Sequence, residues 1–310
     1  MSFIKAVMNR ALPVPNVEYV DVEHYDPGDD IKDPEALAFY HTRPKFKQTQ
    51  GQEVAFPRAS SLYDSCMRMH VIACKEKKKY YRTESISPNM SMIFEMGNAV
   101  HYLIQNTPVF FGSRRIGLWR CLACNKILYW GRPPTKKCPC CGASKEAIFY
   151  SEHMFNPAPP LYCGGHTDLW LHINGGKPRV LDVKTMKDDF FDSLKAPIAA
   201  NEFQIQTYML IAEHDKFLKT RVDTKSGYLF YVGKKIRQGG MPYKMFHVRQ
   251  TEASRKSVMK ILNAFKSGYD NYPNKLPDLL KDCAGKAFMS WKAKQCPCLT
   301  ECTRFHEAGK

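Results

Sequence analysis

The chain has 310 residues, 44% of them hydrophobic, which is enough for one large domain and a small additional module. A formal net charge of +16 and an isoelectric point near 9.3 favour a polyanionic partner such as nucleic acid. We expect an intracellular protein without membrane attachment, because no apolar run is long enough to cross a bilayer and neither a secretory signal nor a basic amphipathic anchor is evident.

Residues 1–56 are predicted to form an extended N-terminal arm. Proline and glycine interrupt this stretch, and its apolar residues follow few regular periods. Through its acidic side chains the arm either packs over a basic surface or folds back toward the DNA channel; otherwise it is a leader with no special role. These acids are Glu18, Asp21, Glu23, Asp26, Asp29 and Asp30.

Two helices are predicted in the next fifty residues. The first begins at Ser60 or Ser61 and runs through Ala73 with apolar spacing near 3.6. It carries Cys66, and a lone helical cysteine commonly packs in a core. The second helix is amphipathic and carries His101, whose imidazole can bind a divalent metal.

Residues 118–147 are predicted to form a zinc ribbon. Two CxxC pairs are separated by a short basic loop, which is the spacing of a tetrahedral four-thiolate site. The predicted ligands are Cys121, Cys124, Cys138 and Cys141, with Cys140 as a bystander or alternate ligand. Basic residues such as Arg132 and several aromatics suit nucleic-acid contact, although the aromatics are equally consistent with a small core.

Two acids and a lysine on predicted strands carry the main signal for chemistry. A Gly-Gly turn makes a hairpin that places Asp168 and Asp182 on neighbouring strands, and side-chain alternation puts Lys184 on the same face as Asp182. Alone, such an Asp-x-Lys pair is usually a solvated ion pair of little worth. Gln204 and Tyr208 project from one face of a later helix. Together these groups suit a divalent cation and a water directed at phosphate.

The remaining elements surround this hairpin. A strand over 148–155 carries Glu152, which either supports the metal site or adds a ligand. Strands at 227–232 and 243–248 flank a basic loop suited to phosphate, and an amphipathic helix follows from Thr251. The predicted DNA contacts in this loop are Lys234, Lys235 and Arg237.

The order of these motifs resembles the PD-(D/E)XK nucleases of the RecB type, which include CRISPR adaptation nucleases. The motifs are Gly97-x-x-x-His101, Glu152, Gly165-x-x-Asp168, Asp182-x-Lys184 and Gln204-x-x-x-Tyr208. The resemblance extends from Arg58 to the C-terminus apart from the ribbon. It implies an α/β fold with a restriction-endonuclease-like mixed central sheet flanked by helices, formed by residues 57–117 and 148–310.

The resemblance also implies a catalytic site. His101, Asp168, Asp182 and the Val183 carbonyl would bind Mg²⁺ or Mn²⁺. Lys184 would position or polarise the attacking water, Gln204 would hold Lys184, and Tyr208 would steady the phosphate or the lysine.

The family further implies a [4Fe-4S] cluster that joins the first helix to the C-terminal tail. The expected ligands are Cys66, Cys296, Cys298 and Cys302, with Cys283 in reserve. The tail spacing C-x-C-x-x-x-C departs from the family pattern, so zinc in the same cage stays open.

The function expected from this reading is a divalent-metal-dependent exonuclease on single-stranded or frayed DNA ends, in replication, recombination or repair. The alternative is a catalytically silent zinc-ribbon factor that binds nucleic acid or recruits proteins. The ribbon could also contact replication, recombination or transcription proteins.

Overall fold

The computed structural model describes most of the chain after the N-terminal arm. The described residues are 56–77, 88–108, 110–157, 159–173, 175–234, 242–280, 283, 296 and 298–308. The predicted arm, except for its last residue, and the predicted DNA contacts Lys235 and Arg237 lie outside these ranges. Within the described ranges, no helix has the length and apolarity needed to cross a membrane.

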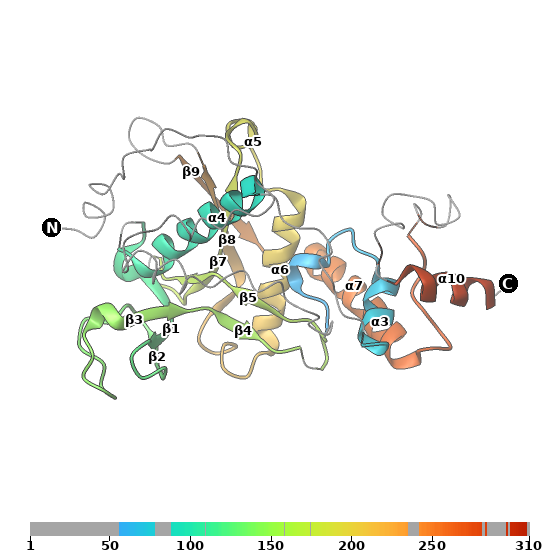
Figure 1. Ribbon diagram of the computed structural model, residues 1–310, viewed down its shortest axis with the longest axis horizontal. Coiled ribbons are helices and arrows are strands. Elements are labelled where there is room, and N and C mark those ends of the chain that lie inside the picture. The colour runs from blue at the N-terminus through green and yellow to red at the C-terminus, as the bar shows by residue number, and fades with distance from the viewer. Residues whose placement is uncertain are drawn as a thin grey trace, which may run out of the picture. The chain divides into compact units, whose positions relative to one another are not determined.

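A mixed sheet forms the centre of the fold (Figure 1). Its strand order is β2-β1-β6-β7-β8-β9, with β3 also paired to β1. The bounds are β1 (Arg115–Cys121), β2 (Ile127–Gly131), β3 (Ile148–Ser151), β6 (Leu169–Leu171), β7 (Arg179–Met186), β8 (Asp223–Gly233) and β9 (Tyr243–Arg249). The β7 and β8 pair is parallel, whereas the other pairs are antiparallel. The predicted mixed α/β fold with a central sheet is confirmed.

Helices pack on both faces of this sheet because β7 and β8 present apolar side chains in both directions. Val183 and Phe230 belong to a core that includes residues of α4 (Pro88–Asn106). Leu229 and Tyr231 point the other way, into a core formed with α6 (Ala199–His214). Every residue from 203 to 212 of α6 is buried, since this helix also packs against α7 (Glu252–Asn271).

The first predicted helix is divided in the structure. A short 3-10 helix, η2 (Ala59–Ser61), is followed by Asp64 with φ of 50°, a left-handed conformation that interrupts helical hydrogen bonding. The α-helix α3 (Met67–Lys75) then begins after Cys66, whose Sγ accepts a hydrogen bond from Met69 N at 3.4 Å. The prediction of one helix from Ser60 or Ser61 is therefore wrong, and Cys66 lies at a helix N-terminus.

The three helices α3, α7 and α10 (Leu299–Ala308) lie together beyond α6 (Figure 1). Thr251 caps α7 by accepting a hydrogen bond from Ser254 N, as expected for a helix that begins there. The remaining short helices are η3 (Gly112–Arg114), η4 (Lys145–Ala147) and α5 (Asp188–Ser193).

The strand predicted over 148–155 is broken at Glu152. Its first part, β3, pairs with β1, whereas β4 (His153–Phe155) pairs with β5 (Gly165–Thr167) in a separate two-stranded sheet. Glu152 consequently lies at the junction between the two sheets and belongs to neither of the two strands.

The ribbon is continuous with the central sheet. Strand β1 pairs with β6 at Arg115 and Ile116, then with β2 and β3 further along. Cys121 is the last residue of β1 and is buried. The cysteine pairs are thus held at the end of a strand that begins in the main sheet.

Candidate active site

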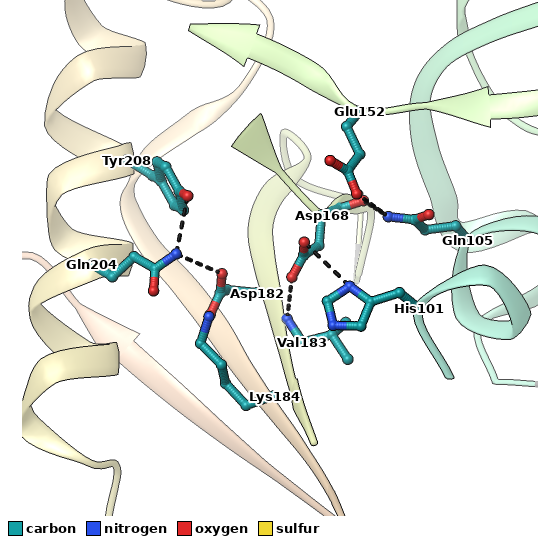
Figure 2. Close-up of polar contacts among 9 residues, drawn as sticks. All are labelled: His101, Gln105, Glu152, Asp168, Asp182, Val183, Lys184, Gln204 and Tyr208. Atoms are coloured by element: carbon teal, nitrogen blue, oxygen red, sulfur yellow. Dashed lines mark hydrogen bonds and ion pairs between the residues drawn. The ribbon is translucent and has the colours of Figure 1, made fainter. Parts of the chain in front are cut away.

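Asp168 lies at the centre of a polar cluster between α4 and β7 (Figure 2). It occupies the single position between β5 and β6. Its Oδ2 accepts a hydrogen bond from the backbone N of Val183 at 2.7 Å, and its Oδ1 lies 3.4 Å from His101 Nδ1. The carboxylate is therefore fixed between the neighbouring strand and α4.

Glu152 completes a group of three ligand side chains. Gln105 Nε2 donates to Glu152 Oε1 at 2.9 Å and to the backbone O of Asp168 at 3.0 Å. One ligand atom each from His101, Glu152 and Asp168 lies within 4.8 Å of the others. Two carboxylates and an imidazole at this spacing can hold a hard divalent cation.

The charges in this group affect one another. Burial raises the pKa of Glu152, and the charge of Asp168 raises it further. Burial by itself would lower the pKa of His101, but the hydrogen bond and charge of Asp168 outweigh it and the pKa is raised. A bound cation would offset the negative charge that these groups share.

Asp182 and Lys184 form a second cluster, on the side of β7 that faces α6 (Figure 2). Asp182 is only 2% exposed, and Lys184 Nζ lies 2.7 Å from its Oδ2. Burial raises the pKa of Asp182 to about 6, with the charge of Asp168 acting in the same direction and Lys184 acting against both. A carboxylate buried in a central strand is costly unless it is paired, and here the lysine supplies the pair.

Two side chains of α6 extend this second cluster. Gln204 Nε2 donates to Asp182 Oδ1 at 3.3 Å and to the Tyr208 hydroxyl oxygen at 3.0 Å. The helical spacing of Gln204 and Tyr208 does bring them together. Gln204 contacts Asp182, however, and not Lys184 as the family resemblance implied.

The predicted metal-binding residues are placed in two clusters. His101 and Asp168 are in contact, and Val183 supplies its N–H to Asp168. Among the described residues, the group whose ligand atoms lie within 4.8 Å of one another has Glu152 as its third member, and Asp182 is not part of it. The difference arises because the Asp182 carboxylate is turned toward Lys184.

Sequence reasoning missed Gln105, which orients Glu152. The available signal was its position four residues after His101 on the same amphipathic helix, which places both side chains on one face. The resulting face of α4 lines a cavity of about 470 Å³ together with Glu152, Thr185 and Lys234.

Gly165 controls the position of Tyr208, which gives a testable prediction. Gly165 has φ of 155°, and a Cβ there would lie 2.8 Å from Tyr208 Cε1. Gly165→Ala should therefore displace the ring and lower the free energy of unfolding by about 1–3 kcal/mol, measured in urea. Gly176→Ala, where a Cβ meets no heavy atom within 4 Å, is the matched control. Equal stability of the two variants would contradict the packing argument.

The four predicted zinc ligands are close together. The Sγ atoms of Cys121 and Cys141 are 3.7 Å apart, and those of Cys124 and Cys138 are 3.9 Å apart. A tetrahedral ion with metal–sulfur bonds of about 2.3 Å requires sulfur separations of about 3.8 Å. The thiols therefore fit one tetrahedral metal ion, and Cys140 is exposed.

The cysteines near the C-terminus pack against α3. Cys298 is fully buried against Ile72 and Ala73, and its Sγ donates to Met69 O at 3.6 Å. Burial raises the pKa of Cys296, and the charges of Cys66, Cys302 and Cys283 raise it further, whereas a hydrogen bond from the backbone of Cys298 lowers it.

Cys296 and Cys302 pack in the same core as Cys298, so the three predicted tail ligands lie together. The charges of Cys66 and Cys283 act on both Cys296 and Cys302. In the described part of the chain, Cys66 and the tail cysteines do not form a group within 4.8 Å as the ribbon cysteines do.

Comparison with known proteins gives remote structural similarity alone. Neither a family model nor a curated protein matches the chain. The alkaline exonuclease of Laribacter hongkongensis is similar over 70% of this chain and 89% of that chain, with 10% identity and a TM-score of 0.40. Its complex with dAMP covers 69% and 88%, with 8% identity and a TM-score of 0.36.

Proposed function

We propose that this chain is a divalent-metal-dependent nuclease that hydrolyses DNA phosphodiesters, acting as an exonuclease on single-stranded or frayed ends in replication, recombination or repair. The observation that carries the proposal is the adjacency of two groups. A ligand group of His101, Glu152 and Asp168 lies next to the buried Asp182 and its partner Lys184. Hydrolysis of a phosphodiester uses both a bound cation and a fixed positive charge.

The ligand group has the composition that Mg²⁺ or Mn²⁺ requires. Asp168 and Glu152 would supply carboxylate oxygens and His101 a nitrogen, with Asp182 available on the other side of Asp168. When bound, such an ion polarises a phosphoryl oxygen and lowers the pKa of a bound water. The backbone N–H of Val183 keeps the Asp168 carboxylate in place for this role.

Lys184 supplies fixed positive charge near the scissile phosphate. Burial would lower the pKa of its ammonium, but the nearby charge of Asp182 outweighs burial and the pKa is raised. The group therefore stays protonated at neutral pH. A preorganised cation can position water and offset the negative charge that develops in the transition state. Gln204 and Tyr208 hold Asp182 in position and act through it.

The other modules would bind DNA and metal. Lys234 lies at the cavity and Arg132 is exposed next to β2, so both can contact phosphates. Lys235 and Arg237 belong to the same proposed contact surface by sequence. The ribbon would hold structural zinc, and Cys66, Cys296, Cys298 and Cys302, with Cys283 in reserve, would hold a [4Fe-4S] cluster.

A second candidate function is a DNA-binding or recruitment factor without turnover. Exposed apolar side chains on the ribbon favour it, since such groups commonly contact proteins. These are Leu122, Ile127 and Tyr129. Replication, recombination or transcription proteins are the candidate partners.

Digestion of labelled single-stranded, blunt and flapped DNA tests the proposed function. We expect cleavage with Mg²⁺ or Mn²⁺, none with a chelator, and a loss of at least about 10²-fold for Asp168→Asn. Asp189→Asn, which changes an exposed carboxylate on α5, should cut at the wild-type rate. DNA binding without cleavage under all conditions would favour the recruitment factor, and cleavage by Asp168→Asn at the wild-type rate would refute the assignment.

A further inference from the structure

One face of α4 carries aromatic side chains that the hydrophobic core does not use. Phe94 is 38% exposed and Tyr102 is 46% exposed, and both line the cavity beside the ligand group. Their separation of eight residues corresponds to about 12 Å along the helix. Between them, Asn98 and His101 project from the same face. The cavity thus has aromatic side chains on both sides of a candidate metal ligand.

Charged groups lie at both ends of this face. Lys234 Nζ donates to Ile93 O at 3.1 Å, which places an ammonium next to Phe94. Near Tyr102, Gln105 holds the Glu152 carboxylate. The order along α4 is therefore a cation, an aromatic ring, a metal ligand, a second ring and an acid. The cation suits a phosphate and the two rings suit unpaired bases of a nucleic-acid strand, whereas the acid belongs to the ligand group.

The ring of Tyr102 packs against β3, the strand that follows the ribbon. The rings of Tyr102 and Phe149 have centroids 6.0 Å apart, and Phe149 belongs to β3. Lys234 in turn is fixed by its backbone N, which donates to Met186 O at the end of β7. Lys234 is therefore attached to β7, whose Val183 N–H holds Asp168, and Tyr102 packs on β3, which ends next to Glu152.

We propose that Phe94 and Tyr102 stack on unpaired nucleobases of the strand whose phosphate lies at the ligand group, and so select single-stranded ends. The proposal rests on the proposed nuclease function. Bases within a duplex have both faces covered by neighbouring pairs, whereas a base at a frayed or single-stranded end can offer one face to an aromatic ring. Lys234 would contact the adjacent phosphate as a point charge.

Abasic substrates test this stacking. The same labelled single strand is digested with its terminal nucleotides intact or replaced by abasic residues. We expect the KM of the wild-type protein to be about 10- to 100-fold higher for the abasic strand. Tyr102→Leu and Phe94→Leu should raise the KM for the intact strand and reduce the difference between the two strands. Tyr102→Phe, which keeps the ring, should retain most of that difference.

The controls separate this proposal from the nuclease function. Phe190→Leu removes an aromatic ring on α5 that is 67% exposed and lies outside the cavity, and it should behave as the wild type. If no cleavage occurs, the affinities for the intact and the abasic single strand are compared instead. They are measured by fluorescence anisotropy with a chelator present. Equal wild-type affinity for intact and abasic strands would overturn the stacking. A difference in binding without cleavage would support stacking and refute the nuclease function.

Discussion

Lys184→Ala is expected to reduce DNA cleavage by at least about 10²–10³-fold while leaving DNA binding nearly unchanged. The ammonium is 2.7 Å from Asp182 Oδ2 and is held on a central strand, so its charge needs no rearrangement during the reaction. Single-turnover rates at saturating protein measure the loss. Anisotropy with labelled single-stranded DNA measures binding.

A matched variant separates the loss of this charge from a loss of fold. Lys187→Ala removes an exposed lysine three residues along the chain, and it should cut at the wild-type rate. Lys184→Met, which keeps most of the side-chain volume, should be as inactive as Lys184→Ala. Thermal unfolding of each variant shows whether the buried Asp182 tolerates the loss of its partner. Cleavage by a folded Lys184→Ala protein at the wild-type rate would remove Lys184 from the mechanism.

Cys121→Ser is expected to release one zinc ion per chain and to unfold the ribbon. The thiol is buried at the end of β1 and lies 3.7 Å from Cys141 Sγ. Structural zinc contributes about 10–16 kcal/mol in zinc-finger peptides at neutral pH, which exceeds the net stability of many domains. Zinc content by elemental analysis and protease cleavage within residues 118–147 measure the two effects.

Cys140→Ser is the matched control for the ribbon. This thiol is exposed, and its residue contacts Cys138 Sγ through the backbone N, which the substitution retains. We expect zinc content and protease resistance equal to those of the wild type. A Cys121→Ser protein with full zinc content and an intact ribbon would contradict the four-thiolate site.

The local order of the site could be predicted from sequence because it depends on short-range periodicity. The turn before β7 places Asp168 next to that strand, and alternation puts Asp182 and Lys184 on one side of it. The helical spacing of Gln204 and Tyr208 fixes their contact in the same way. The first relation follows from a single hairpin and the others hold within four residues, so none of them requires knowledge of the wider packing.

The choice among neighbouring ligands could not be predicted, because it depends on where strands and helices are interrupted. Glu152 joins the ligand group because the strand predicted through it breaks there, and Gln105 then orients it. The φ of 50° at Asp64 moves Cys66 to a helix N-terminus.

A crystal of the protein soaked in Mn²⁺ tests the central claim directly, because anomalous scattering locates the ion. We expect one strong peak at bonding distance from Asp168, with His101 and Glu152 on its other sides and the Asp182 carboxylate facing it. A peak at some other group of side chains, or a soaked site in which Asp168 keeps its direct contact with His101 and binds no ion, would contradict the account.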